Sequence, residues 1–275
     1  MSGDDALSTA LRRERAIALT ALLVIATLAW LWLLREAQRM SGMDRSSMGG
    51  MRMSYLQMLS PAYAPWTWTL GTYLFCMWFV MMIGMMTPSA APMVLLYLGV
   101  SRHAVRTGHR FTSAGWFFGG YLIAWAAFSL IATLAHWWLE SVALMTPMMR
   151  TASRPLGAAV LIAAGIYQWL PLKDACLAQC RAPLSFIQQH GGFRPEASAA
   201  LRLGFTHGWY CVGCCWVLML LLLVGGVMNL LWIASLAAFV LIEKLAPGGR
   251  WISRAAGVVA IAAGLWVLRA WFFSG

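Results

Sequence analysis

Long apolar runs divide the chain into segments whose length suits a lipid bilayer. A helix needs about 20 apolar residues to cross the hydrocarbon core. The candidate runs are residues 16–34, 68–100, 114–139, 155–171, 205–228, 230–245 and 252–273. They predict an all-α fold, a polytopic bundle of about seven transmembrane helices.

The second run is too long for a simple crossing, since residues 68–100 would extend about 50 Å as one helix. It contains Pro88 and Pro92, so we expect a long helix that is kinked near these prolines. A break into a helix and a short re-entrant piece is the alternative. Between the fifth and sixth runs, Gly225-Gly226 and Asn229 predict a tight hairpin turn.

Composition supports the membrane assignment and excludes a soluble domain. Hydrophobic residues make up 61% of the 275 residues and charged residues only 11%, against about 25% charged in soluble proteins. The net charge of +11 therefore indicates orientation rather than nucleic-acid binding. Most Lys and Arg residues fall at the end of the runs that holds the N-terminus. This bias predicts a bacterial inner-membrane protein with a cytoplasmic N-terminus.

The runs also predict the domain organisation. Residues 1–15 form a cytoplasmic N-terminus, 16–34 the first transmembrane helix, 35–67 an outer loop, and 68–275 a six-helix metal-binding membrane domain. The outer loop is rich in methionine, at Met40, Met43, Met48, Met51, Met53 and Met58. Thioether sulfur suits Cu(I) or Ag(I), so the loop is a candidate for metal capture. An interfacial segment whose methionines dip into lipid is the alternative.

Methionine is also concentrated in the second run. Met77, Met81 and Met85 form one i, i+4, i+8 row, and Met82 and Met86 form a neighbouring row. Residues four apart share a helix face, so these sulfurs are candidate metal ligands along one side of the helix. The alternative is that methionine, which is apolar and adaptable, fills gaps between helices.

Five of the six cysteines form two groups, Cys176 with Cys180 and Cys211-x-x-Cys214-Cys215. At helical spacing, His207, Cys211, Cys215 and Met219 lie on one face, which gives a row of soft donors. Two or three thiolates suit Cu(I), and addition of His207 or the Cys176/Cys180 pair suits tetrahedral Zn(II). Packing of small residues at a helix interface is the alternative. Gly204 and Gly208 predict a close approach by a neighbouring helix.

Glu243 and Lys244 end the sixth run. An intramembrane carboxylate is functional by default. Because Lys244 is adjacent and the interface is near, we expect instead a helix-end ion pair that anchors the helix.

Four separated blocks carry a resemblance to a known family. They are Met81-Met82-x-x-Met85-Met86-x-Pro88-Ser89, the stretch from Ala164-Gly165 to Cys180-Arg181-x-Pro183, Cys211-x-x-Cys214-Cys215-Trp216, and Glu243-Lys244. In this order they resemble a bacterial family of predicted metal-binding integral membrane proteins. The resemblance implies metal binding but neither a reaction nor a direction of transport.

These features favour a membrane protein that binds and passes on a soft metal ion, most of all Cu(I), as a permease or a metallochaperone. The bilayer is one partner, a copper chaperone or copper-dependent enzyme is another, and homo-oligomers stay open. No Gly-x-x-x-x-Gly-Lys-Ser/Thr string occurs, so the chain is not a self-contained ATP-driven pump. The main alternative is an enzyme, a thiol-disulfide oxidoreductase that uses Cys211/Cys214 with Cys176/Cys180. A copper oxidase and a structural Zn(II) staple are further alternatives.

Overall fold

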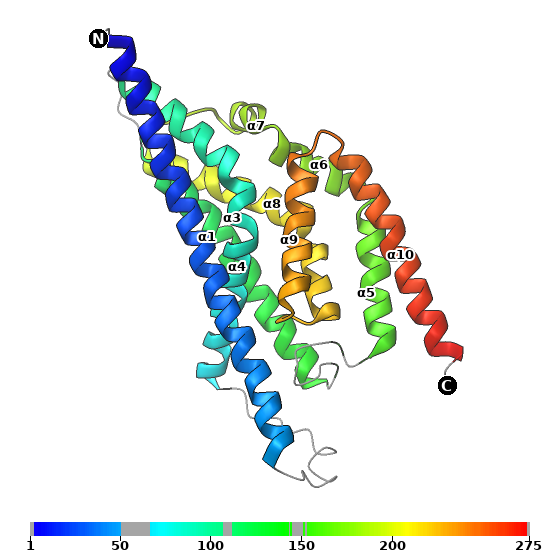
Figure 1. The fold of residues 1–275 in the computed structure, drawn as a ribbon. Coiled ribbons are helices and arrows are strands. Elements are labelled where there is room, and N and C mark those ends of the chain that lie inside the picture. Colours follow the sequence, from blue (N-terminus) through cyan, green and yellow to red (C-terminus); the bar gives the residue numbers. More distant parts are fainter. Residues whose placement is uncertain are drawn as a thin grey trace.

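Helices make up the fold. The computed structural model describes residues 3–50, 67–106, 112–142, 144, 151 and 153–273. Within these residues the helices are α1 (Gly3–Gly50), α3 (Trp68–Arg106), α4 (Ala114–Ser141), α5 (Arg154–Tyr167), α6 (Pro171–Arg181), α7 (Pro183–Gln189), α8 (Ala197–Gly225), α9 (Leu230–Leu245) and α10 (Gly249–Phe273) (Figure 1). The predicted all-α fold is confirmed.

Five of the described helices are long and apolar enough to cross a membrane, namely α1, α3, α4, α8 and α10. A sixth crossing is formed if α5 and α6 count as one, with a bend of 64° between them. Pro171 begins α6, and proline cannot continue the hydrogen bonding of the preceding helix. Helix α9 has 16 residues, or about 24 Å. The seven predicted runs thus become five full crossings, one bent pair and one short helix.

The helices run back and forth between two ends of the molecule. The N-terminus, α6, α7 and the α9–α10 connection lie at one end, which we name the α6–α7 end, and the C-terminus lies at the other (Figure 1). This order agrees with the alternation of loops predicted from the sequence. The side of the membrane that each end faces stays a prediction.

Helix α1 extends to Gly50, so residues 35–50 of the predicted outer connection are helical. The residues after Leu34 are Arg-Glu-Ala-Gln-Arg-Met, which are good helix formers on the whole, and they prolong the transmembrane helix. The rest of the predicted Met-rich loop, residues 51–66, lies outside the described residues. Metal capture by this segment stays a prediction.

Helix α3 continues through Pro88 and Pro92 as one element, so the predicted long helix is found, and its kink near the prolines stays a prediction. Proline has no N–H, so Pro88 leaves the carbonyl of Gly84 without its usual helical partner. The indole Nε1 of Trp30 in α1 donates to this oxygen at 3.2 Å. Helix α1 therefore satisfies a backbone group that the proline has exposed.

Glycines bring the backbones of α4 and α8 into contact. A Cβ placed on Gly120 would lie 2.0 Å from the carbonyl oxygen of Leu201. One placed on Gly204 would lie 1.9 Å from the carbonyl oxygen of Phe117. A Cβ placed on Gly208 would also meet atoms of α4, those of Ala124 and of the Tyr121 backbone. The close approach predicted at Gly204 and Gly208 is confirmed, and small residues are the usual means of such packing in membranes.

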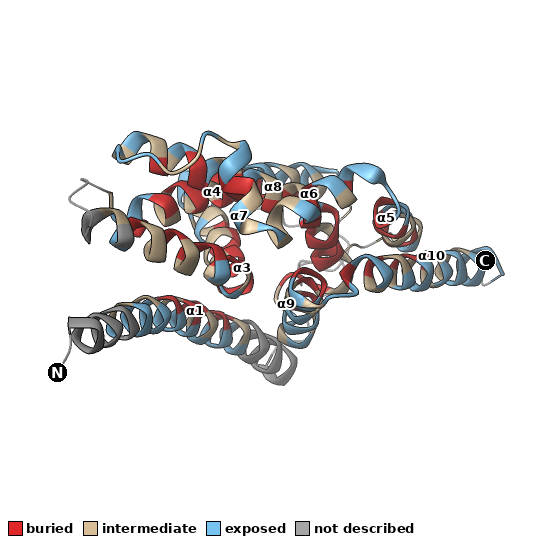
Figure 2. Ribbon diagram, turned by 90° about the horizontal axis from the view of Figure 1, so that it is seen from above, coloured by how far each residue is buried: buried red, intermediate tan, exposed pale blue. Residues whose placement is uncertain are grey.

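Buried residues concentrate on α3, α4, α6, α8 and α9, while α1 and α10 lie at the two edges (Figure 2). The edge helices expose large apolar side chains such as Leu23 and Trp266. These surfaces suit contact with lipid tails.

The turn between α8 and α9 is the predicted hairpin. Gly226 has a φ of 98°, and the Asn229 side chain accepts a hydrogen bond from the N–H of Trp232.

The contact between α4 and α8 can be tested with adjacent glycines. Gly120→Ala should lower the unfolding temperature in detergent, by the equivalent of about 3 kcal/mol, because its Cβ meets the α8 backbone. Gly119→Ala is the matched control, since a Cβ there has no atom within 4 Å. Equal unfolding temperatures for the two variants would contradict the backbone contact.

Candidate metal centre

The predicted donor row lies along the buried face of α8. His207 and Cys211 are each 2% exposed, and Cys215 and Met219 are fully buried. The row faces the bundle because the glycine contact with α4 fixes the rotation of α8. The spacing of four residues thus does what the sequence predicted and aligns the four side chains within the core.

The sulfur of Cys211 lies at the centre of a polar network. The ammonium Nζ of Lys244, on α9, donates to Cys211 Sγ at 2.9 Å and to Ser89 Oγ at 3.3 Å. The Tyr121 hydroxyl, on α4, lies 3.2 Å from Cys211 Sγ and donates to the carbonyl oxygen of Met86 at 3.2 Å. Groups from α4 and α9 therefore meet at one sulfur of α8, and both are also hydrogen bonded to α3.

The other thiols surround Cys211. Cys214 and Cys215 donate to the carbonyl oxygen of Cys211 at 3.1 and 3.0 Å. Cys180, on α6, packs against the buried cluster that contains Cys211 and Cys214. A Cβ on Gly213 would lie 2.9 Å from Cys176 Sγ, so this glycine makes room for α6. The structure therefore brings the two cysteine groups of the sequence together.

The methionine rows of α3 belong to the same buried core. Met77, Met81, Met82, Met85 and Met86 are at most 2% exposed. They form one apolar cluster with Cys176, Cys211, Cys214, Cys215 and Met219. Thioether and thiol sulfur therefore share one contiguous interior that spans α3, α6 and α8.

His207 is in the row but is held by aromatic rings. Its ring centroid lies 5.2 Å from Phe186, 5.9 Å from Phe117 and 6.0 Å from Tyr121. Its Nδ1 is buried and has no hydrogen-bond partner. The imidazole is therefore available as a donor, although its position is set by ring packing rather than by the cysteines.

The donors are gathered but are not arranged as a finished polydentate site. Among the described residues, no three His, Cys, Asp or Glu side chains are placed to hold a metal ion together. The reason is visible in the hydrogen bonds, because the thiols of Cys214 and Cys215 point at a backbone carbonyl. A soft ion that needs only two or three sulfur ligands fits this donor set better than one that requires a tetrahedral cage.

Sequence reasoning missed the role of Tyr121, which lies in no motif, and gave no role to Ser89, although Ser89 belongs to the first block of the resemblance. It also misjudged Glu243 and Lys244. These two do not pair with each other at the interface. Both are buried, and Glu243 Oε1 lies 2.5 Å from Nζ of Lys173 on α6, with both side chains fully buried. The sequence showed that Glu243 and Lys244 end a helix. It could not show that both are buried with different partners, because this results from the packing of α9 against α3, α6 and α10.

The Lys173–Glu243 ion pair is supported on both sides. Gln168 accepts a hydrogen bond from Lys173, and Ser253 donates one to Glu243. The pair joins α6 to α9 and α10, close to the end of α5. Lys173 lies three residues before Cys176, and Glu243 is next to Lys244. The ion pair therefore holds the cysteine pair of α6 beside the centre.

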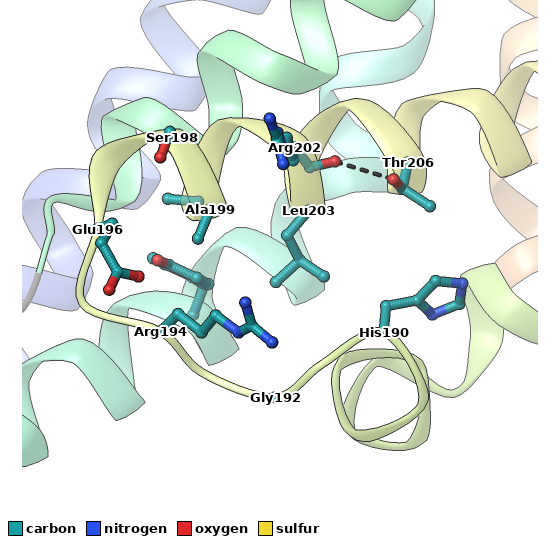
Figure 3. Close-up of a pocket in the computed structure, with 11 residues that line it drawn as sticks. His190, Gly192, Arg194, Glu196, Ser198, Ala199, Arg202, Leu203 and Thr206 are labelled. Atoms are coloured by element: carbon teal, nitrogen blue, oxygen red, sulfur yellow. Dashed lines mark hydrogen bonds between the residues drawn. The ribbon is translucent and has the colours of Figure 1, made fainter.

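A surface pocket of about 420 Å³ lies elsewhere, at the α6–α7 end. Figure 3 shows that it is bounded by the start of α8 and by the segment that follows α7, with the side chains of His190, Arg194 and Glu196 around it. Neither cysteine nor methionine lines it. The concentration of soft donors therefore places the candidate metal centre in the core and not in this pocket.

The fold and the centre define a class: a polytopic helical membrane protein whose buried core gathers thiol and thioether sulfur. A family model described as "PpoB2: Copper chaperone" matches residues 75–267. This range covers most of the chain, so the chain belongs to this copper-chaperone family, and it contains all the predicted donors of α3, α6 and α8. No curated protein and no solved structure matches the chain. The match supports a copper-related role.

The buried ion pair gives a prediction about the support of the centre. Lys173→Met and Glu243→Gln should each destabilise the protein by about 3 kcal/mol, because either leaves one buried charge unpaired. The double variant should lose much less than the sum of the two. Thermal unfolding in detergent measures all three.

The exposed pair of Asp174 with Arg250, whose atoms lie 2.8 Å apart, is the control for that cycle. Its coupling should not exceed about 1 kcal/mol. A coupling between Lys173 and Glu243 as small as this would show that the buried pair does not hold α6 in place.

Proposed function

We propose that the protein is a membrane-embedded Cu(I) chaperone that receives the ion on sulfur within the bundle and transfers it to a partner. The observation that carries this is the convergence of the thiols of Cys211, Cys214 and Cys215, with Cys180 packed against them, and the methionine rows of α3 in one buried core. The family description supports the chaperone role.

The two kinds of sulfur suggest a path. Thioethers bind Cu(I) without deprotonation, whereas thiolates are anionic and bind it more tightly. Met81 and Met85 would therefore pass the ion to Cys211 and its neighbours with rising affinity. Transfer onward requires a partner that removes the ion, either a second copper chaperone or a copper-dependent enzyme.

The location follows from the charge bias of the sequence. We propose a bacterial inner membrane with the α6–α7 end in the cytoplasm. The cysteines then lie toward the reducing compartment, where thiols stay free for metal binding. The lack of an ATP-binding loop in the sequence agrees with movement of the ion along a gradient of affinity.

Replacement of the cysteine pair tests the metal centre. The reduced, purified protein should bind Cu(I) in competition with a chromogenic Cu(I) chelator, and Cys211→Ser with Cys215→Ser should lower the affinity at least about 100-fold, since thiolates are the strongest donors present. Cys76→Ser is the control because Cys76 is exposed on α3. If the reduced wild type bound no Cu(I), the proposed function would be wrong.

The methionine rows should affect transfer more than storage. Met81→Leu with Met85→Leu keeps the size and apolar character of the core while removing two sulfurs. We expect Cu(I) loading in proteoliposomes to slow by about tenfold, with the equilibrium affinity nearly unchanged because the cysteines remain. Met93→Leu is the matched control, since Met93 is equally buried but lies in a separate cluster. An equal effect of both changes would exclude a special role for the rows.

One contact favours a second candidate function. Cys180 of α6 packs against the cluster that contains Cys211 and Cys214 of α8, so the thiols of the two helices lie in one neighbourhood, as disulfide exchange requires. A thiol-disulfide oxidoreductase would form a trappable mixed disulfide with a partner when one of these cysteines is replaced. This mixed disulfide distinguishes it from the chaperone, which transfers the metal ion without forming a disulfide with its partner.

A further inference from the structure

Lys244 carries a buried positive charge that no carboxylate balances. Its side chain is nearly fully buried at the end of α9. In the described part of the chain, its neighbour Glu243 is paired with Lys173, and no ion pair includes Lys244. The Lys173–Glu243 pair is neutral by itself, so the ammonium of Lys244 is the remaining charge of this part of the core.

The ammonium is aimed at sulfur. It has hydrogen-bond donors only, so Cys211 Sγ must accept at 2.9 Å. Cys214 and Cys215, whose thiols donate to the carbonyl oxygen of Cys211, belong to the same buried cluster. Tyr121, the other group on the Cys211 sulfur, is neutral. An unpaired charge is strongly unfavourable in a low-dielectric interior, so Lys244 stabilises anionic sulfur at this position.

We propose that Lys244 is the charge-selecting residue of the metal centre, which makes a soft monovalent ion preferred over a soft divalent ion. This inference rests on the proposed function and concerns which ion the centre accepts. Thiolates bind both soft monovalent and soft divalent ions. The softness of the ligands alone therefore does not explain a preference for a monovalent ion, whereas the charge of Lys244 does.

The charge balance gives the reason. A monovalent ion with two thiolates has a net charge of minus one, and the ammonium makes the buried assembly neutral. Each thiol that becomes a ligand releases its proton to water. A divalent ion on the same two thiolates would leave the assembly with a net positive charge.

A divalent ion could restore neutrality only with a third thiolate. It would also demand a fourth donor for tetrahedral geometry. No three His, Cys, Asp or Glu side chains of the described residues are arranged for that. The geometry and the charge therefore act in the same direction.

Ag(I) and Cd(II) are the probes, because both are soft and they differ in charge. We expect Lys244→Met to lower the affinity of the reduced, full-length protein for Ag(I) relative to Cd(II) by about 30-fold or more, in line with loss of one partner of a buried charge pair. Lys244→Arg keeps the charge and should retain most of the preference. Competition titrations in detergent, with circular dichroism to verify folding, give the ratio.

Two further variants separate charge from hydrogen bonding. Lys244→Gln keeps a donor toward Cys211 and Ser89 but loses the charge, so it should shift the ratio as Lys244→Met does, and it serves if the methionine variant does not fold. Tyr121→Phe removes the neutral hydroxyl from the same sulfur and should weaken both ions alike.

The outcomes distinguish this inference from the proposed function. If the wild type bound neither Cu(I) nor Ag(I), the chaperone function itself would fail. If it bound both, but folded Lys244→Met and Lys244→Gln kept the wild-type ratio of Ag(I) to Cd(II), only the role of Lys244 would be overturned. A shift in ratio with Tyr121→Phe as large as with Lys244→Gln would also overturn it.

Discussion

The backbone contact between α4 and α8 is the constraint on which the rest of the core depends. With hydrogen atoms in place of side chains at Gly120 and Gly204, the two helices touch directly. This sets the rotation of α8 and places Tyr121 against Cys211. Helix α8 then contacts α5, α6 and α9 through its remaining faces. A larger side chain at the crossing would move the donor row away from its neighbours.

Charged groups are accommodated in this core by local neutrality. Lys173 and Glu243 neutralise each other and have polar partners from α5 and α10. Lys244 is placed against sulfur instead of oxygen. Polar groups at membrane depth must be satisfied within the protein, and here the same contacts bind α6, α9 and α10 to α8. Structural support and site chemistry thus come from the same residues.

The helices and the donor row of α8 could be predicted from the sequence, because the periodicity of residues along one helix is a local property. The spacing of His207, Cys211, Cys215 and Met219 determines a helix face once the helix is given. The packing of Cys180 against the cluster that contains Cys211 could not be predicted, since it depends on the bend between α5 and α6. Lys244 was noticed only as a helix end. Its contact with Cys211 arises from the packing of α9, which leaves no local pattern in the chain.

Helix α1 also completes the backbone hydrogen bonding of α3. The matched family region begins at residue 75, after α1, and yet Trp30 supplies the donor for the Gly84 carbonyl inside that region. A relative that begins its bundle at α3 and keeps Pro88 would need another donor for this oxygen, either from a second subunit or from water. The N-terminal helix and the proline are therefore linked: removal of the Trp30 indole would leave the Gly84 carbonyl without this donor as long as Pro88 is present.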